Sequence, residues 1–198
     1  MRLPGPTHRA LGFQYREEAE RFLEQLQERM GKFGLELHPE KTRLIEFGRY
    51  ATERRRKHGE GKPETFNFLG FTHICGASRT TGYFTVLRTT IGKRMAAKLK
   101  DIKVKLRQRM QETVAGTASW LQSVVRGYLQ YHAIPGNEAT LKSFRQSVLR
   151  LWLRQLRRRS QRSRWTWQRF LPRLGVLLPE VHVLHPYPDA RFDAKHPR

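Results

Sequence analysis

The sequence contains little that could build a disulfide, a membrane anchor or a secretion signal. Cys75 is its single cysteine, which excludes an internal disulfide and a cysteine-based zinc site. A lone thiol on an apolar strand face is typical of core packing. No apolar run approaches the roughly 20 residues of a membrane span, and the first fifteen residues lack the apolar core of a secretory signal. We therefore expect a soluble cytoplasmic protein with no membrane partner.

Carboxylates are scarce where metal chemistry would need them. The three aspartates, Asp101, Asp189 and Asp193, lie in a basic helical segment and in the C-terminal tail, whereas two-metal enzymes need clustered carboxylates. The glutamates between residues 17 and 28 recur along one expected helix and are interpreted as its solvated face. The eight histidines form no HExxH motif, and no glycine loop with GK[ST] is present. The residues alone predict no catalytic centre, no metal site and no cofactor.

Positive charge is abundant but unevenly distributed. Residues 79–173 contain 22 lysines and arginines against three acidic residues, whereas residues 1–78 contain 14 against 11 and residues 174–198 three of each. A block of one sign must be neutralised by a polyanion, and nucleic acid is the usual one. A membrane surface is a second interpretation of this block. A solvated charged face is a third, although such faces usually mix the two signs.

The first 90 residues alternate helical and strand patterns. Apolar residues at helical spacing predict a helix over 16–33, and two short strands are expected near Leu35–Leu37 and Thr42–Phe47. Residues 49–65 are polar and predict a loop. A strand over 66–74 has apolar residues on both faces, as a strand buried inside a sheet does, and the turn-rich GASRTTG joins it to a strand over 83–87.

From residue 91 onward the apolar pattern is helical. A stripe from Ile91 to Met110 predicts one helix, a second is expected at about 117–132, and a third runs to about Arg159 with Asn137 as a possible cap. The proline- and histidine-rich tail is expected to lie extended over these helices. The predicted organisation is α+β: residues 1–90, then a three-helix domain over 91–173, then a tail over 174–198.

The basic residues of the helical block are the candidate RNA contacts. Arginine forks suit phosphate, and in RRRSQRSRWTWQR they are interleaved with Trp165 and Trp167, whose faces could stack on bases. Complementation of a helix dipole is the alternative interpretation of Arg157–Arg159, and core packing is an equal alternative for both tryptophans. The candidate RNA-binding set is Lys93, Arg94, Lys98, Lys100, Lys103, Arg107, Arg126, Arg150, Arg154, Arg157, Arg158, Arg159, Arg162 and Arg164.

The order of several motifs resembles one protein family. The run LGFQYREEAERFLEQLQERMGKFGLELHPEKTRLIEFG, then GKPETFNFLGFTH, WLQSVVRGYLQYHAIPGN and SFRQSVLRLWLRQLRRRSQR, is similar to the C-terminal part of bacterial group II intron reverse transcriptase/maturases. The resemblance covers nearly everything from Leu11 to the end. It implies the last part of a palm followed by a thumb or maturase domain that grips intron RNA and the template–primer duplex. It also implies that a thumb-anchoring strand contains Phe66, Phe68, Leu69, Gly70 and Phe71.

One departure from the family changes what the resemblance implies for activity. Family members carry a YADD-type tetrapeptide, whose aspartates bind the catalytic metals, just before the segment that resembles LGFQYREEAERF. Here the preceding residues are MRLPGPTHRA, without aspartate. The resemblance therefore predicts a truncated or separately encoded piece without catalytic residues, which would use Mg²⁺ only if complemented by the missing catalytic half.

These observations predict an RNA-binding, maturase-type fragment of a bacterial mobile element that assists the folding and splicing of group II intron RNA, without polymerase activity of its own. One alternative is a subunit of a split RNA-directed DNA polymerase, whose partner would be an upstream reverse-transcriptase fragment. A further alternative is a decayed reading frame without a cellular role.

Overall fold

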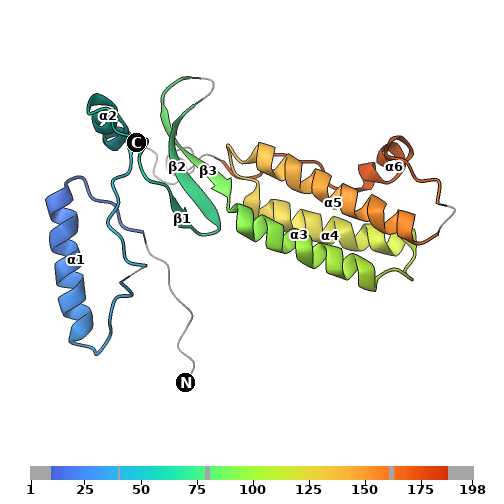
Figure 1. The fold of residues 1–198 in the computed structure, drawn as a ribbon, viewed down its shortest axis with the longest axis horizontal. Helices are drawn as coiled ribbons and strands as arrows, with labels where there is room; N and C mark the ends of the chain where they lie inside the picture. Colours follow the sequence, from blue (N-terminus) through green and yellow to red (C-terminus); the bar gives the residue numbers. More distant parts are fainter. Residues whose placement is uncertain (1–9, 40, 79–80, 161–162, 187–198) are drawn as a thin grey trace. The chain divides into compact units, whose positions relative to one another are not determined.

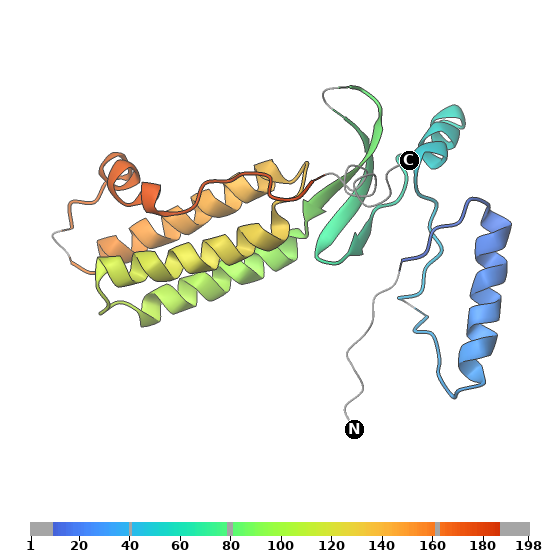
Figure 2. The same cartoon turned by 180° about the vertical axis from the view of Figure 1, so that it is seen from behind.

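The chain has a mixed α+β fold, as predicted from the sequence. The computed structural model describes residues 10–39, 41–78, 81–160 and 163–186, which contain six α-helices and a small antiparallel three-stranded sheet (Figures 1 and 2). Two compact units are present, and each is considered separately. The N-terminal unit is Met1–Leu69 with His73–Val86, and the helical unit is Gly70–Thr72 with Leu87–Arg198.

Helix α1, Arg16–Gly31, confirms the first predicted helix to within two residues. Glu17 and Glu18 lie in its first turn, where a carboxylate complements the positive end of the helix dipole. The helix stops shortly before Gly34, which has a left-handed backbone with φ of +66°. Ala19 is its one buried residue.

The two strands predicted between residues 35 and 47 are wrong. The described residues 35–39 and 41–47 have no regular secondary structure, and the side chains of Leu35 and Leu44 are exposed. A short strand is stable only when a neighbour accepts its backbone hydrogen bonds, and the described sheet contains β1, β2 and β3 alone. Alternating apolar residues were therefore an insufficient signal.

The polar loop predicted at 49–65 contains a helix, α2, Arg49–Lys57. Its sequence, RYATERRRK, is rich in residues with high helix propensity. Gly48, with φ of +114°, lets the chain enter the helix, and Ala51 is buried against the unit. The polar composition of residues 49–65 suggested a loop, whereas the helix propensity of residues 49–57 was the better guide.

The single strand predicted at 66–74 is a hairpin. Strand β1, Phe66–Phe68, and strand β2, Phe71–Ala77, are joined by Leu69 and Gly70, whose φ angles are +46° and +86°. Two successive left-handed residues form the tight turn whose twist matches that of the flanking strands. The expected thumb-anchoring strand is thus two strands and a turn. Leucine rarely adopts a positive φ, and the Leu-Gly pair is not the usual Asn-Gly or Asp-Gly turn signal. The sequence therefore did not predict this turn.

Strand β3, Phe84–Thr90, completes the sheet in the order β1-β2-β3. The Ser78 amide donates to the Tyr83 carbonyl at 2.8 Å and closes the predicted turn between β2 and β3. The strand continues three residues beyond its predicted end at residue 87. Because only Ile91 separates β3 from the next helix, the sheet leads directly into the helical unit.

Three long helices form the helical unit: α3, Gly92–Gln108, α4, Val114–His132, and α5, Glu138–Arg158. This confirms the three predicted helices, although α4 begins three residues early because the Thr113 hydroxyl accepts a hydrogen bond from the Gly116 amide. The core is apolar and continuous. Its fully or nearly fully buried members include Ile102, Leu106, Leu121, Val125, Leu141, Phe144, Val148, Leu149, Trp152, Leu156 and Phe170.

The chain returns along α5 after a short, unpredicted helix, α6, Trp167–Arg173, and a 3-10 turn, Gly175–Leu177 (Figure 2). The Arg145 guanidinium donates to the carbonyls of Gly175, Leu178 and Pro179, which fixes this return. The tail that was predicted to be extended over 174–198 therefore begins with a 3-10 turn, and residues 178–186 have no regular secondary structure. Residues 187–198 lie outside the described part of the chain.

Candidate nucleic-acid interface

A basic groove lies between helices α3 and α5, which pack against each other. Lys103 and Arg107 border it from α3, and Arg154 and Arg158 border it from α5. The remaining lining residues are Leu106, Met110, Leu151 and Gln155. We call this surface the α3–α5 groove. It brings four of the predicted RNA-binding residues together from segments about fifty residues apart in the sequence.

Helix geometry explains why these four cations share one surface. Lys103 and Arg107 are four residues apart, as are Arg154 and Arg158, so each pair occupies one helix face. All four are exposed, and none forms an ion pair with a residue that the structure describes. Uncompensated like charges in a groove create a positive potential that attracts a polyanion.

The same spacing extends the basic surface toward the starts of both helices. Lys100 precedes Lys103 by three residues and Lys93 precedes Lys100 by seven, so each lies within about 60° of the next around α3. Arg150 precedes Arg154 by one turn on α5. All three are exposed. The predicted set therefore contributes seven residues to two adjoining helix faces, a row that suits a linear array of phosphates.

The other predicted contacts of α3 and α4 lie elsewhere. Lys98 is 3.9 Å from the Asp101 carboxylate, which also pairs with Lys105 at 3.0 Å, so its charge is partly compensated. Arg94 faces the β1–β2 turn. The Nη1 atom of Arg94 lies 3.4 Å from the position that a Cβ atom on Gly70 would occupy. Arg126 is exposed on α4, which does not line the groove.

The arginines after Arg158 are partly structural. The Arg159 guanidinium donates to the carbonyl of Met110 at 3.0 Å and to that of Glu112, and thereby joins the end of α5 to the α3–α4 connection. Arg157 donates to the carbonyl of Trp165 at 2.8 Å. Arg164 is exposed in the connection to α6, and Arg162 lies outside the described residues. Two of the three residues Arg157–Arg159 therefore bond backbone carbonyls.

Both tryptophans of the predicted stacking surface pack inward. The rings of Trp165 and Trp167 are half-buried, with centroids 6.4 and 6.0 Å from the ring of Phe170. Phe170 in turn meets Trp152 edge-on at 5.4 Å. Of the two interpretations left open by the sequence, this packing favours core anchors over base-stacking platforms.

The residues of the expected anchoring strand divide between the two units. In the N-terminal unit, Phe66 stacks on His73 at 4.8 Å and meets Phe47 edge-on at 4.9 Å. In the helical unit, the ring of Phe71 stacks on Tyr131 at 5.9 Å. The Gly70 carbonyl accepts a hydrogen bond from the Ile91 amide at 3.1 Å, which fixes the start of α3.

A buried polar network, which sequence reasoning missed, joins β3 to the α4–α5 corner. The Asn137 side chain is fully buried; its Oδ1 accepts from the Thr90 amide at 3.0 Å. Its Nδ2 donates to Thr90 Oγ1 at 2.8 Å and to the His132 carbonyl at 2.9 Å. Asn137 occupies the N-cap position of α5, as predicted, but its side chain makes no capping hydrogen bond because it is engaged in this network.

His132 and Tyr128 pack beside this network. Their rings stack with centroids 4.1 Å apart, and His132 Nδ1 lies 3.0 Å from the Tyr128 carbonyl. Burial lowers the pKa of His132, and the nearby Arg94 guanidinium lowers it further, while the backbone hydrogen bond opposes the shift. Burial raises the pKa of Tyr128. Both groups are therefore neutral at physiological pH.

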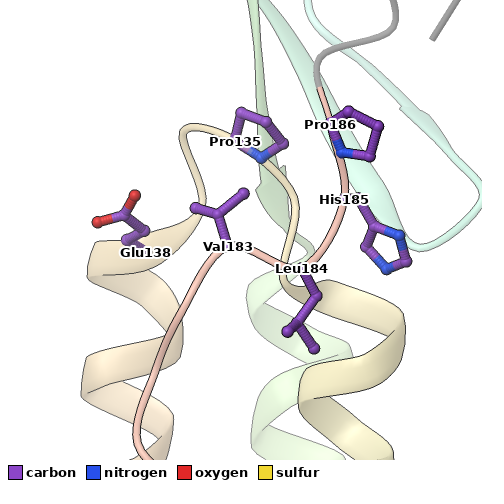
Figure 3. A pocket seen from close by; sticks show the side chains of 6 residues that line it. All are labelled: Pro135, Glu138, Val183, Leu184, His185 and Pro186. Carbon is purple, nitrogen blue, oxygen red and sulfur yellow. The ribbon is translucent and has the colours of Figure 1, made fainter.

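A second hollow of about 410 Å³ lies where the returning tail crosses the α4–α5 connection, and Figure 3 shows its lining. Glu138 and His185 lie on opposite sides of it, with Val183, Leu184 and two prolines between them. His185 Nε2 is held 2.6 Å from the Gln130 carbonyl. These polar groups do not converge on a common point, so the α3–α5 groove is the stronger candidate site.

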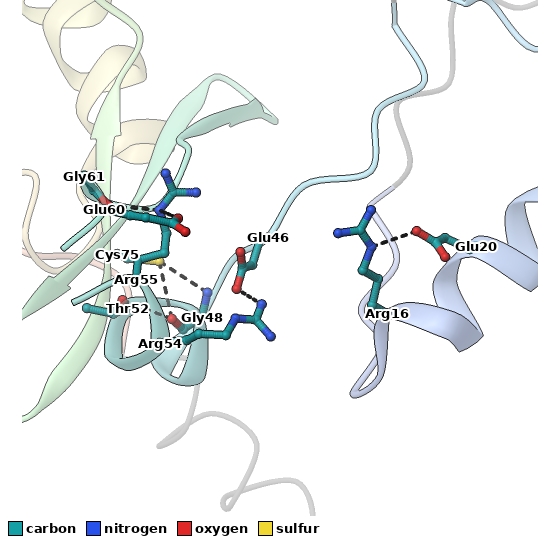
Figure 4. Close-up of polar contacts among 10 residues, drawn as sticks. All are labelled: Arg16, Glu20, Glu46, Gly48, Thr52, Arg54, Arg55, Glu60, Gly61 and Cys75. Atoms are coloured by element: carbon teal, nitrogen blue, oxygen red, sulfur yellow. Dashed lines mark hydrogen bonds and ion pairs between the residues drawn. The ribbon is translucent and has the colours of Figure 1, made fainter. Parts of the chain in front are cut away.

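Polar groups of the N-terminal unit are largely satisfied within it (Figure 4). Arg16 pairs with Glu20 at 2.7 Å, Arg54 pairs with Glu46, and the Cys75 thiol accepts from the Gly48 amide at 3.3 Å. Cys75 is buried, as predicted. No three histidine, cysteine or acidic side chains gather into a metal-binding group within the described ranges. No helix of the described chain is both long and apolar enough to cross a membrane.

No protein-family model matches the chain, and no curated protein or solved structure is significantly similar to it.

Proposed function

We propose that this chain binds structured RNA through the α3–α5 groove and assists the folding and splicing of group II intron RNA, as a maturase-type fragment without polymerase activity of its own. The observation that supports RNA binding is the set of four exposed, unpaired cations that line one groove. The neighbouring Lys93, Lys100 and Arg150 lengthen this surface. The intron as the target rests on the family resemblance of the sequence motifs.

The experiment measures RNA affinity as a function of salt. A triple variant, Arg107→Ala, Arg154→Ala and Arg158→Ala, removes three groove charges while leaving the buried core intact. Each lost phosphate contact reduces the magnitude of the log–log salt slope by about one, so we expect a reduction of about two to three. A folded group II intron RNA and an unrelated structured RNA of equal length serve as the two probes.

A matched control removes equal charge from outside the groove. Arg126, Arg169 and Arg173 are exposed and do not line it, so their joint replacement by alanine should lower affinity less and change the slope less. Equal effects of the two triple variants would show that binding follows net charge rather than the groove. Equal affinity for both RNAs would contradict the intron as the specific target.

A second candidate function is supported by the N-terminal unit. Among its described residues, the buried members of its apolar core are Ala19, Ala51 and Cys75, whereas Phe33 and Tyr50 are 71% and 79% exposed. Such a unit suits a subunit that is completed by another chain, as in a split reverse transcriptase. Co-expression with an upstream reverse-transcriptase fragment should then yield a stable complex with Mg²⁺-dependent primer extension, and the chain alone should show none.

A further inference from the structure

An unsatisfied hydrogen-bond acceptor lies in the α3–α5 groove. Gln155 is only 5% exposed, although it lines the same hollow as the four cations. Its Nε2 makes a long hydrogen bond, 3.5 Å, to the Arg109 carbonyl. Its Oε1 is buried and has no hydrogen-bond partner among the described residues. A buried acceptor without a donor is unfavourable, so a ligand that supplies the donor gains affinity.

The surroundings of this oxygen restrict what the donor can be. The hollow measures about 20 Å³, which is room for one water or one hydroxyl group. Leu106, Met110 and Leu151 supply apolar lining, while the rim is cationic. Met110 and Arg158 are long and unbranched, so a change of rotamer in either can admit a hydroxyl. The complementary ligand carries phosphate charge and a small neutral donor on one backbone.

We propose that Gln155 Oε1 accepts a hydrogen bond from a ribose 2′-hydroxyl of RNA held in the α3–α5 groove, and that this bond helps the protein to distinguish RNA from DNA. The 2′-hydroxyl is the group that RNA has and DNA lacks, and A-form RNA displays it in a wide, shallow minor groove. The inference rests on the proposed function, because the four cations must first hold the phosphates.

The test separates the hydroxyl donor from the shape of the helix. Three hairpin probes share one sequence: RNA, 2′-fluoro RNA and DNA. The 2′-fluoro probe keeps phosphates and A-form geometry but cannot donate a hydrogen bond at the 2′ position. We expect the full-length chain to bind RNA about five- to tenfold more tightly than 2′-fluoro RNA, the factor for about one hydrogen bond.

Two variants locate the acceptor. Gln155→Met keeps the length of the side chain without its amide oxygen. We expect this variant to bind RNA only as tightly as the unmodified chain binds 2′-fluoro RNA, and its affinity for 2′-fluoro RNA to be unchanged. Gln146→Met is the matched control on the exposed face of α5 and should keep the full preference. The preference of the unmodified chain for RNA over 2′-fluoro RNA is measured without any variant. A folding defect in Gln155→Met would therefore still leave one test of the 2′-hydroxyl contact.

The outcomes distinguish this inference from the proposed function. Equal affinity of the unmodified chain for RNA and 2′-fluoro RNA, or an undiminished preference in Gln155→Met, would overturn the role of Gln155. The proposed function would survive either result if the groove triple variant still weakened binding to both probes. Binding that responds to neither salt nor the groove arginines would overturn both.

Discussion

The two units of this chain differ most in how completely they bury their apolar side chains. The helical unit buries large residues completely, among them Phe144, Trp152 and Phe170. In the described part of the N-terminal unit, the buried members of the apolar core are two alanines and Cys75. Complete burial of a Leu, Phe or Met side chain stabilises a fold by about 1.5–3 kcal/mol, whereas an exposed ion pair such as Arg16–Glu20 contributes little because water screens it. The helical unit therefore supplies most of the stability, and the N-terminal unit contributes little of it.

Hydrogen exchange of the full chain should show the largest difference. Helices α1 and α5 are both regular, but only α5 is held by a buried core. We expect amides in the middle of α5 to exchange about three orders of magnitude more slowly than those in α1, because α1 opens locally and α5 opens with its unit. Protection of α1 within tenfold of that of α5 would contradict the comparison.

Truncation of one aromatic residue in each unit gives the next largest effect. Trp152 is fully buried, so Trp152→Ala should lower the free energy of unfolding by about 3–5 kcal/mol. Tyr50 is 79% exposed, so Tyr50→Ala should change it by less than about 0.5 kcal/mol. Urea unfolding followed by far-ultraviolet circular dichroism reports on both units, whereas tryptophan fluorescence reports on the helical unit alone, because all four tryptophans lie there. A loss below 1 kcal/mol in Trp152→Ala would show that this core is loosely packed.

The Asn137 network gives an intermediate effect. Asn137→Ala removes three hydrogen bonds and leaves the Thr90 amide and hydroxyl without their partner, at a cost of about 2–3 kcal/mol. A double-mutant cycle with Thr90→Val measures how much of that cost the pair shares. Additive losses would indicate that the two residues act independently and that Asn137 serves mainly through the His132 carbonyl.

The sequence predicted the helical unit well because its signals are redundant. Apolar spacing, breakers at Pro135 and Gly136, and long uninterrupted segments all agree, and each of the three helices was confirmed. The same approach failed in the N-terminal unit. The short apolar runs at 35–47 have the pattern of strands, but no neighbouring strand pairs with them. Leu69 adopts a left-handed backbone conformation that is rare for leucine and that its residue type therefore does not predict.

The candidate site was predictable only in part. Charge and helical spacing identified Lys103, Arg107, Arg154 and Arg158, but nothing in the sequence shows that α3 and α5 are neighbours. Periodicity could not indicate that Arg159 bonds the Met110 carbonyl, because such a bond depends on where a loop far along the chain lies. Tertiary placement, rather than local pattern, separates arginines that face solvent from those that hold backbone carbonyls.

The smallest expected effect is a dependence of stability on pH within the helical unit. His132 packs against Phe71 from β2 and against Tyr128 and Tyr131 on its own helix, and Arg94 is the charged group that faces it from α3. Burial lowers its pKa in the folded chain below the unfolded value of about 6.5. The unfolded chain therefore takes up a proton first as pH falls, so stability is fully present above about pH 6.5 and declines as pH falls toward the lowered folded pKa.

His132→Gln, which is neutral at every pH, should flatten this decline, whereas His58→Gln, at the exposed residue that follows α2, should leave it unchanged. The measurement is the urea midpoint of the helical unit between pH 7.5 and 5, where the two variants are compared with the unmodified chain. Carboxylates that titrate over the same range contribute equally to all three proteins, so the difference isolates His132. If His132→Gln loses as much stability on acidification as the unmodified chain, the imidazole accepts its proton without opening the aromatic cluster, and the packing around Phe71 is looser than that around Trp152.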